Sequence, residues 1–138
     1  MILLSSPLVC AAFLAVWLES GGPVIHRRRV IRRGGGTFEA FKIRTMVQDA
    51  DRILQNDESL RRQFQATNKL VIDPRITPVG RWLRRLSIDE FPQLVNVLRG
   101  QMSLVGPSMI TEAELPGGGA VGRRWLSVRP GLTGLGQV

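Results

Sequence analysis

The stretch RRLSIDEFPQL, residues 84–94, decides how the middle of this chain folds. Apolar residues recur at helical spacing on both sides of Ser87: Val79, Trp82, Leu83 and Leu86 before it, and Phe91, Leu94, Val95 and Leu98 after it. The pattern predicts two amphipathic helices that meet at Ser87, the second ending at Gly100. The adjacent acids Asp89 and Glu90 would then lie at the corner between these helices.

Two interpretations of Asp89 and Glu90 follow from the residues alone. In the structural one, Ser87 caps the second helix and Glu90 reaches back to the Ser87 amide, while Asp89 sits in the first turn, where the helix dipole favours negative charge. In the chemical one, a carboxylate pair among arginines acts on an anionic substrate, one acid attacking while the other handles a proton or a metal ion. The two are compatible, because a helix N-terminus also offers its amides to a phosphate.

The charge of the chain points to an anionic partner. Its 138 residues suffice for one domain with a modest core, and 19 basic against 11 acidic residues give a net charge of +8. Aromatic residues are sparse and tyrosine is absent, which argues against a surface that stacks single-stranded nucleic acid. The single histidine, His26, adjoins three arginines, so a zinc site is not expected. Cys10 lies in an apolar run and is predicted to be buried.

Residues 1–18 carry no charge, which is typical of a membrane segment at the short limit for a span. Pro7 would break or kink a helix there. A signal peptide and a buried core helix are the alternatives. The basic cluster at residues 26–33 favours membrane association with this side facing the cytoplasm and its anionic lipid headgroups.

The rest of the chain predicts short elements of both kinds. Residues 24–33 and 37–44 indicate two strands that three glycines join into a hairpin. A helix is predicted over 47–66, a brief strand and turn over 102–107, and a rigid turn over 129–134. The predicted fold class is therefore a small α/β fold of the α+β kind, mainly helical.

Five motifs occur in order along the chain: KIRTM at 42–46, DPRIT at 73–77, LSIDEFPQL at 86–94, MSLVGP at 102–107 and VRPGLTG at 128–134. Together they resemble the bacterial sugar transferases. These are the monotopic polyprenyl-phosphate glycosyl-1-phosphate transferases, or undecaprenyl-phosphate sugar phosphotransferases, that begin exopolysaccharide, O-antigen and glycoprotein glycan assembly. The similarity covers nearly the whole chain, and the ordered set is far more specific than any one motif.

The resemblance implies a phosphoglycosyl transferase. A UDP-sugar would give its sugar-1-phosphate to undecaprenyl phosphate, with release of UMP. Asp89 would be the nucleophile that forms an aspartyl-phosphosugar intermediate, and Glu90 would assist the acceptor phosphate. Both acids would also be ligands of Mg²⁺, which would screen the diphosphate from Asp89.

The resemblance also assigns basic residues to substrate phosphates: Lys42, Arg44, Arg75 and Arg129. Guanidinium forks suit phosphate, although an ordinary surface ion pair is the alternative for each residue. The other arginines at residues 27–29, 81, 84 and 85 are expected to face the membrane surface or solvent.

The resemblance further implies partners and a location. Ser6-Pro7 matches the bend that returns the family's N-terminal helix to the cytoplasmic leaflet. Residues 1–22 would thus be a re-entrant or interfacial helix and residues 23–138 a catalytic domain on the cytoplasmic face of the bacterial inner membrane. The expected partners are a UDP-sugar, undecaprenyl phosphate and membrane lipid, with no nucleic acid and with a homodimer left open.

Three features depart from the family pattern. Ser108 stands where an arginine is usual, Gly136 stands where a bulky residue is usual, and the chain is expected to be truncated at both ends. These departures favour a second hypothesis, a catalytically inactive, membrane-bound remnant or partner-binding paralogue. A nucleic-acid-binding protein is a third hypothesis, which charge alone supports and the apolar first 18 residues oppose.

Overall fold

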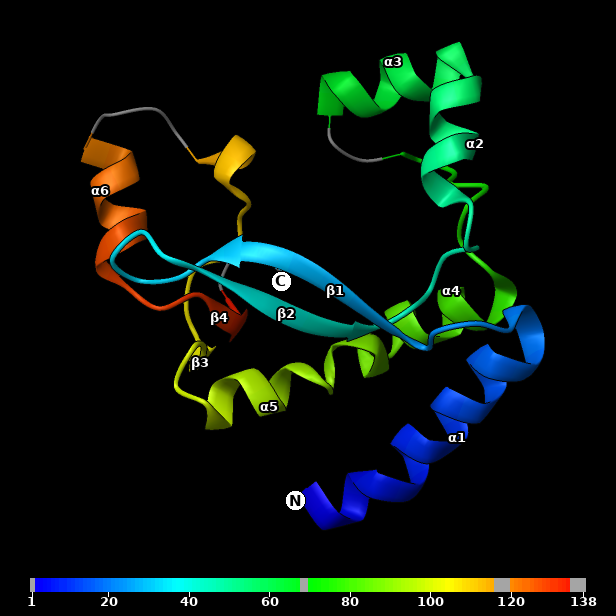
Figure 1. The fold of residues 1–138 in the computed structure, drawn as a ribbon, viewed down its shortest axis with the longest axis horizontal. Coiled ribbons are helices and arrows are strands. Elements are labelled where there is room, and N and C mark those ends of the chain that lie inside the picture. The colour runs from blue at the N-terminus through cyan, green and yellow to red at the C-terminus, as the bar shows by residue number, and fades with distance from the viewer. Residues whose placement is uncertain (1, 68–69, 116–119, 135–138) are drawn as a thin grey trace. The chain divides into compact units, whose positions relative to one another are not determined.

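The computed structural model describes residues 2–67, 70–115 and 120–134 (Figure 1). In chain order the elements are α1 (Ile2–Ser20), β1 (Ile25–Ile31), β2 (Thr37–Ile43), α2 (Ala50–Asn56), α3 (Glu58–Thr67), α4 (Pro78–Arg85), the 3-10 turn η1 (Ile88–Glu90), α5 (Gln93–Leu98), β3 (Ser103–Val105), the 3-10 turn η2 (Glu112–Glu114), α6 (Ala120–Ser127) and β4 (Gly131–Thr133). This mixed, mainly helical content confirms the predicted fold class.

The chain divides into two compact units. The first unit comprises Met1–Val24 and Arg44–Asp89, and the second comprises Ile25–Ile43 and Glu90–Val138. The boundary falls between the two adjacent acids, so Asp89 ends one unit and Glu90 begins a segment of the other.

The second unit is built on the predicted hairpin. Strands β1 and β2 pair antiparallel, with Ile25 opposite Ile43 and Ile31 opposite Thr37. Gly34 and Gly35 take φ values of 86° and 89° in the turn, a region that favours glycine. The apolar face of the hairpin packs on residues from later in the chain. The core there consists of Val30, Phe38, Ala40 and Met102, with Val97 and Met109 packed against it.

Helix α5 lies along β2 (Figure 1) and is fixed there by Asn96, which is fully buried. Its Oδ1 accepts the Phe41 amide at 3.2 Å, and its Nδ2 donates to Glu39 O and to Gln101 Oε1, both at 2.8 Å. The Asn96 side chain thereby bonds the Phe41 amide and the Glu39 carbonyl oxygen, two backbone groups of β2 that would otherwise lack a partner in a neighbouring strand.

Strands β3 and β4 pair in parallel, Ser103 with Gly131 and Val105 with Thr133. The prediction of a brief strand at 102–107 is confirmed, whereas the rigid turn predicted over 129–134 is in part a strand. Glycine is required where the two segments meet, because a Cβ on Gly131 would lie 2.2 Å from the Gly106 amide nitrogen. Pairing between segments some thirty residues apart leaves no local signal in the sequence.

The first unit packs α1 against α4 (Figure 1). Thr77 caps α4 by accepting the Gly80 amide at 2.9 Å, and Glu19 accepts the Val79 amide at 3.0 Å. Gly80 lies against backbone, since a Cβ there would be 2.1 Å from the Thr45 carbonyl oxygen. The helix predicted upstream of Ser87 is thus confirmed.

Several predictions need correction. The helix expected over 47–66 is two helices, because Asp57 is extended and its carboxylate accepts the Leu60 amide at 3.0 Å, which starts α3. Helix α1 continues through Pro7, so the helix is not broken there. Cys10 is exposed rather than buried. Within the described residues, no helix has both the length and the hydrophobicity needed to span a bilayer.

Candidate active site

The acids Asp89 and Glu90 lie on η1, and not in the first turn of a long helix as predicted. Ser87 has φ 54°, a left-handed conformation that ends the preceding helix, and its amide donates to Arg84 O at 3.1 Å. Helix α5 begins only at Gln93, after Pro92. The predicted capping box is therefore wrong, because neither the Ser87 amide nor the Glu90 carboxylate is used for it.

Asp89 is buried, with 6% of its surface exposed. Acidic side chains are seldom buried, because a carboxylate removed from water costs free energy unless it is bonded. In the second unit, Glu90 is half-buried and forms an ion pair with Lys42 of β2, whose Nζ lies 2.7 Å from Glu90 Oε1. The structure thus pairs two of the predicted site residues that are 48 positions apart.

Arg44 is buried in the first unit. Its Nη2 donates to Ser20 Oγ at 2.7 Å and to the Gly21 carbonyl oxygen. Its Nε and Nη1 are buried and have no hydrogen-bond partner among the described residues. Arg44 therefore fixes the chain after α1 and still carries two buried donors.

Arg75 is engaged by the protein itself. Its Nε and Nη2 donate to the two oxygens of Asp73 at 2.8 and 2.7 Å, and both side chains are less than a tenth exposed. These hydrogen bonds hold the pKa of Asp73 below its ordinary value, against the opposing effect of burial, and they raise the pKa of Arg75. The guanidinium also lies 5.3 Å from the centroid of the Phe64 ring.

Arg129 lies in the second unit beside a hollow of about 240 Å³, where it is one of four arginines. Arg99 was not singled out by sequence reasoning, and Arg32 and Arg33 were predicted only as part of the basic cluster at residues 26–33. The turn that carries Arg32 and Arg33 is recognisable from its glycines. The sequence holds no signal that Arg99 and Arg129 line the same hollow as this turn.

Other residues have roles that the sequence did not reveal. Arg28, expected at the membrane surface or in solvent, donates to both oxygens of Glu114 at 2.9 and 2.8 Å. Burial alone would raise the pKa of Glu114, but hydrogen bonds from Thr111 and the charge of Arg28 hold it below its ordinary value. Gln93 is fully buried, and neither polar atom of its side chain has a partner among the described residues.

Asp89 and Glu90 would be the protein's ligands for a divalent cation that arrives with a phosphate. Among the described residues there is no group of three or more His, Cys, Asp or Glu that could hold an ion unaided. Mg²⁺ commonly binds through one or two protein carboxylates, with water and substrate phosphates completing the shell. Asp89 and Glu90 supply two such carboxylates, and the ion pair with Lys42 uses one oxygen of Glu90.

A family model described as bacterial sugar transferase matches residues 1–138. The chain belongs to the bacterial sugar transferase family. This membership confirms the resemblance drawn from the five motifs.

Similar proteins within the family are named for exopolysaccharide production or for the transfer of a sugar phosphate to undecaprenyl phosphate. The chain is 42% identical to the exopolysaccharide production protein ExoY of Sinorhizobium fredii over 137 residues, 96% of this chain and 61% of that protein. It is 40% identical to the undecaprenyl-phosphate galactose phosphotransferase of Salmonella typhimurium, over 99% of this chain and 29% of that protein. It is 39% identical to the UDP-glucose:undecaprenyl-phosphate glucose-1-phosphate transferase of Escherichia coli, over 99% of this chain and 28% of that protein. The chain spans about three fifths of the length of ExoY and a smaller share of the other two.

Proposed function

We propose that this chain carries the catalytic machinery for transfer of sugar-1-phosphate from a UDP-sugar to undecaprenyl phosphate, with release of UMP. The observation that carries the proposal is a buried carboxylate, Asp89, followed directly by Glu90. Lys42 balances the charge of Glu90 through an ion pair. Family membership and the names of the relatives support the same reaction class.

In the first step, a carboxylate oxygen of Asp89 attacks the β-phosphorus of the UDP-sugar. A bond forms between that oxygen and phosphorus, the bond to the bridging oxygen breaks, and UMP leaves with the electron pair. The sugar phosphate is then held on the enzyme as an acyl phosphate. Such transfers depend mainly on positioning and on neutralising charge.

In the second step, an oxygen of undecaprenyl phosphate attacks the same phosphorus and Asp89 leaves as a carboxylate. Glu90 is the base that accepts the proton of the incoming phosphate, and Lys42 holds it in place through the 2.7 Å ion pair. Magnesium, bound by Asp89, Glu90 and the diphosphate, would supply charge neutralisation.

The proposed substrate-binding residues remain Lys42, Arg44, Arg75 and Arg129. Arg44 offers its two buried donors, and Arg129 offers an exposed guanidinium beside the hollow. Arg75 would have to share its guanidinium between Asp73 and a phosphate, so we propose that it chiefly shapes the loop before α4.

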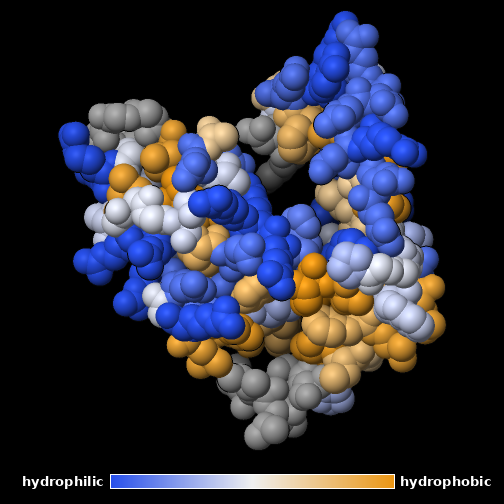
Figure 2. Space-filling model, in the orientation of Figure 1, coloured by the Kyte–Doolittle hydropathy of each residue, from blue (hydrophilic) through white to orange (hydrophobic). Residues whose placement is uncertain are grey.

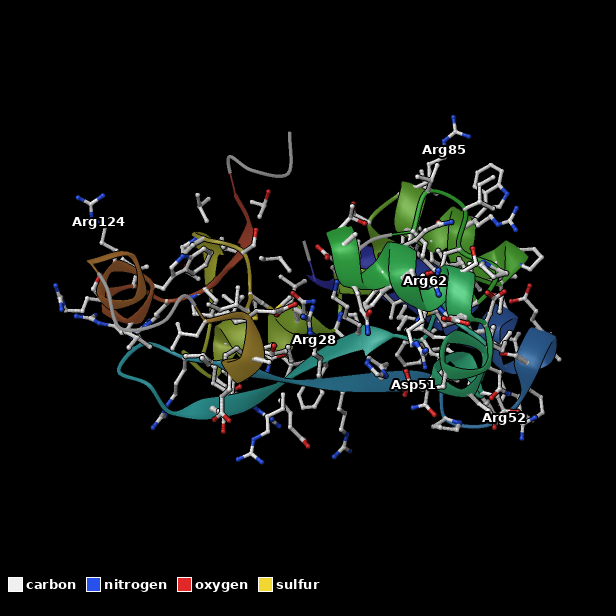
Figure 3. The ribbon with its side chains drawn as sticks, turned by 90° about the horizontal axis from the view of Figure 1, so that it is seen from above. Arg28, Asp51, Arg52, Arg62, Arg85 and Arg124 are labelled. Carbon is white, nitrogen blue, oxygen red and sulfur yellow. The ribbon has the colours of Figure 1, made fainter. Side chains whose placement is uncertain are left out.

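We further propose that the first unit lies against the cytoplasmic face of the inner membrane. Apolar surface gathers along α1 (Figure 2), and the large exposed side chains include Trp17 at 56% and Trp82 at 65%. Exposed arginines accompany them on α4, and Arg85 extends away from the ribbon (Figure 3). Apolar anchors flanked by arginine suit the interface with anionic lipid.

The test is UMP release from UDP-galactose and UDP-glucose by detergent-purified protein with Mg²⁺ and undecaprenyl phosphate. We expect release by the wild type and a loss of about a thousandfold or more in Asp89→Asn. Asp51→Asn, an exposed acid of α2, is the matched control and should retain full activity. Unchanged release by Asp89→Asn would contradict the role of Asp89.

One observation favours the second candidate, a catalytically inactive paralogue. Ser108 is exposed where the family usually has an arginine, and Gly136 lies outside the described residues. A folded wild type that releases no UMP from either sugar, but does so as Ser108→Arg, would support this candidate over the active enzyme.

A further inference from the structure

The hollow beside Arg129 has an unusually basic lining. Its volume is about 240 Å³, and all of its lining residues belong to the second unit: Arg32, Arg33, Arg99, Gly100, Gln101 and Arg129. No acidic side chain occurs in this lining, and none of the four arginines forms an ion pair with a described residue.

Other arginines of the same hairpin are neutralised by the protein. Arg27 pairs with Glu39 at 3.3 Å and Arg28 with Glu114 at 2.8 Å. Four guanidinium groups around one hollow repel each other, and an anion between them would relieve that repulsion. The contrast indicates that the counter-charge of the hollow comes from a ligand.

The backbone fixes Arg32 and Arg33 at the hollow. The Arg32 amide donates to Gly36 O at 2.8 Å, and the Gly34 amide donates to Leu126 O at 2.9 Å, which ties the hairpin turn to α6. A Cβ on Gly36 would lie 2.7 Å from Arg32 Nε, so the Arg32 side chain lies directly over this glycine. The turn therefore presents two adjacent arginines from a restrained backbone.

Arg99 and Gln101 flank Gly100, and all three residues line the hollow. Gly100 has φ 70° and its amide donates to Val97 O at 2.9 Å, which ends α5. The Arg99 guanidinium lies 5.5 Å from the centroid of the Phe41 ring, and stacking of this kind leaves the N–H edges for an acceptor. The Gln101 side-chain oxygen accepts from Asn96, so the group remaining on that amide is a donor.

Arg129 approaches from the loop before β4. That loop is held on both sides, since Pro130 O accepts the Ser103 amide and the Gly131 amide donates to Pro107 O, each at 2.9 Å. Four cations and one amide donor thus come from three separately anchored segments. Such preorganised donors are what recognition of a phosphate requires.

We propose that this hollow is a phosphate-binding site in which Arg32, Arg33 and Arg99 act together with Arg129. The volume is below the range of about 300–1,000 Å³ that suits drug-sized ligands, as expected for a phosphate or diphosphate group.

A phosphate group reaches this protein from two sources, a soluble nucleotide or a lipid headgroup, and its recognition by arginine is the same for both. The choice of these carriers rests on the proposed function. The site itself is tested by binding alone, without turnover, so its failure and the failure of the transferase reaction are distinguishable.

The experiment compares wild type with Arg32→Gln/Arg33→Gln and with Arg99→Gln. The matched control is Arg123→Gln/Arg124→Gln, which removes an adjacent pair of exposed arginines from α6; Arg124 extends away from the ribbon (Figure 3). Binding of inorganic pyrophosphate is measured by calorimetry in detergent. Binding to vesicles of phosphatidylcholine, with and without one-fifth phosphatidylglycerol, is measured by flotation at the same ionic strength. Circular dichroism melts check that each variant is folded.

We expect both hollow variants to bind at least one probe about tenfold more weakly than wild type, and the control to change by less than threefold. A loss for pyrophosphate alone assigns the site to a soluble diphosphate. A loss for anionic vesicles alone assigns it to a lipid headgroup, and a loss for both shows that it takes either. Unchanged binding of both probes, or an equal loss in the control, would overturn the proposal.

Discussion

Two sets of arginines, one in each unit, are used in opposite ways. In the first unit, Arg44 and Arg75 are buried and bonded to groups of their own chain. In the second unit, the four arginines of the hollow are half or fully open to solvent and have no ion pair with a described residue. Both sets include residues that family motifs single out as phosphate ligands. A motif therefore identifies the residue type, while its surroundings decide whether that residue supports the fold or remains available to a ligand.

The energetic reason lies in burial. A guanidinium taken out of water needs partners that satisfy its donors, and Asp73 does this for Arg75 through two hydrogen bonds. An exposed guanidinium keeps its water shell without a protein partner, so its donors stay available to a ligand. Substitutions in each set test this difference, and the largest loss of stability is expected in the buried set.

The largest effect is expected for Asp73→Asn. This change leaves Arg75 buried without its counter-charge and should lower the free energy of unfolding by about 3–5 kcal/mol. The control is the double variant Asp73→Leu/Arg75→Met, which removes both charges and should recover most of the loss. Urea unfolding followed by circular dichroism measures both. A loss below 1 kcal/mol in the single variant would show that the pair is not buried in solution.

The same pair predicts a pH dependence. Arg75 holds the pKa of Asp73 below its ordinary value of 3.8. The stabilisation is therefore fully present above that value and is lost as the pH falls through the lower pKa of the folded state. The difference in unfolding free energy between wild type and Asp73→Asn should be constant from pH 7 to 5 and shrink below pH 4. A difference that grows toward acid would contradict the pairing.

A smaller effect is expected for Arg44→Met. The change removes the hydrogen bonds to Ser20 and Gly21 but keeps the apolar stem, so we expect a loss of about 1–3 kcal/mol. Arg52→Met, an exposed arginine of α2 whose ion pair with Asp49 is open to solvent, is the matched control and should change stability by less than 1 kcal/mol. Equal losses would remove the distinction between the two kinds of arginine.

The smallest effect on stability is expected in the hollow. Without a phosphate ligand, Arg99→Gln should change the free energy of unfolding by less than about 0.5 kcal/mol at physiological salt. At low salt it should be slightly stabilising, because the repulsion between Arg99 and the other three arginines is then unscreened and the variant removes it. Melting temperatures in 10 mM and 150 mM NaCl, with Arg124→Gln as control, measure this. Clear destabilisation at both salt concentrations would mean that Arg99 is a structural residue.

Much of the fold could be predicted because its signals are local. Alternation around the three glycines predicts the hairpin, and helical spacing predicts α4. The helix that ends before Gly100 was predicted correctly, but its start at Ser87 was wrong. A left-handed φ at Ser87 and the proline at 92 turn the chain into η1 before α5 begins at Gln93. The helix over 47–66 was wrong because extended backbone at Asp57 interrupts a pattern that periodicity alone reads as continuous.

The candidate site could be predicted only as a set of residues. Motifs identified Asp89, Glu90 and Lys42, but the ion pair between Lys42 and Glu90 joins positions far apart in the chain. The ion pair between Arg75 and Asp73 could have been predicted, since the two residues lie two positions apart on either side of a proline. The hollow could not have been predicted, because its arginines come from a turn, a helix end and a loop that only the tertiary fold brings together.

The most direct test of the catalytic proposal is the intact mass of the protein after mixing with UDP-galactose or UDP-glucose and Mg²⁺ in the absence of undecaprenyl phosphate. Wild type, quenched in acid, should gain the mass of one sugar phosphate on the peptide that contains Asp89, and this gain should disappear when the acceptor is added. Asp89→Asn should show no adduct. An adduct on another residue, or UMP release by Asp89→Asn at the wild-type rate, would contradict Asp89 as the nucleophile.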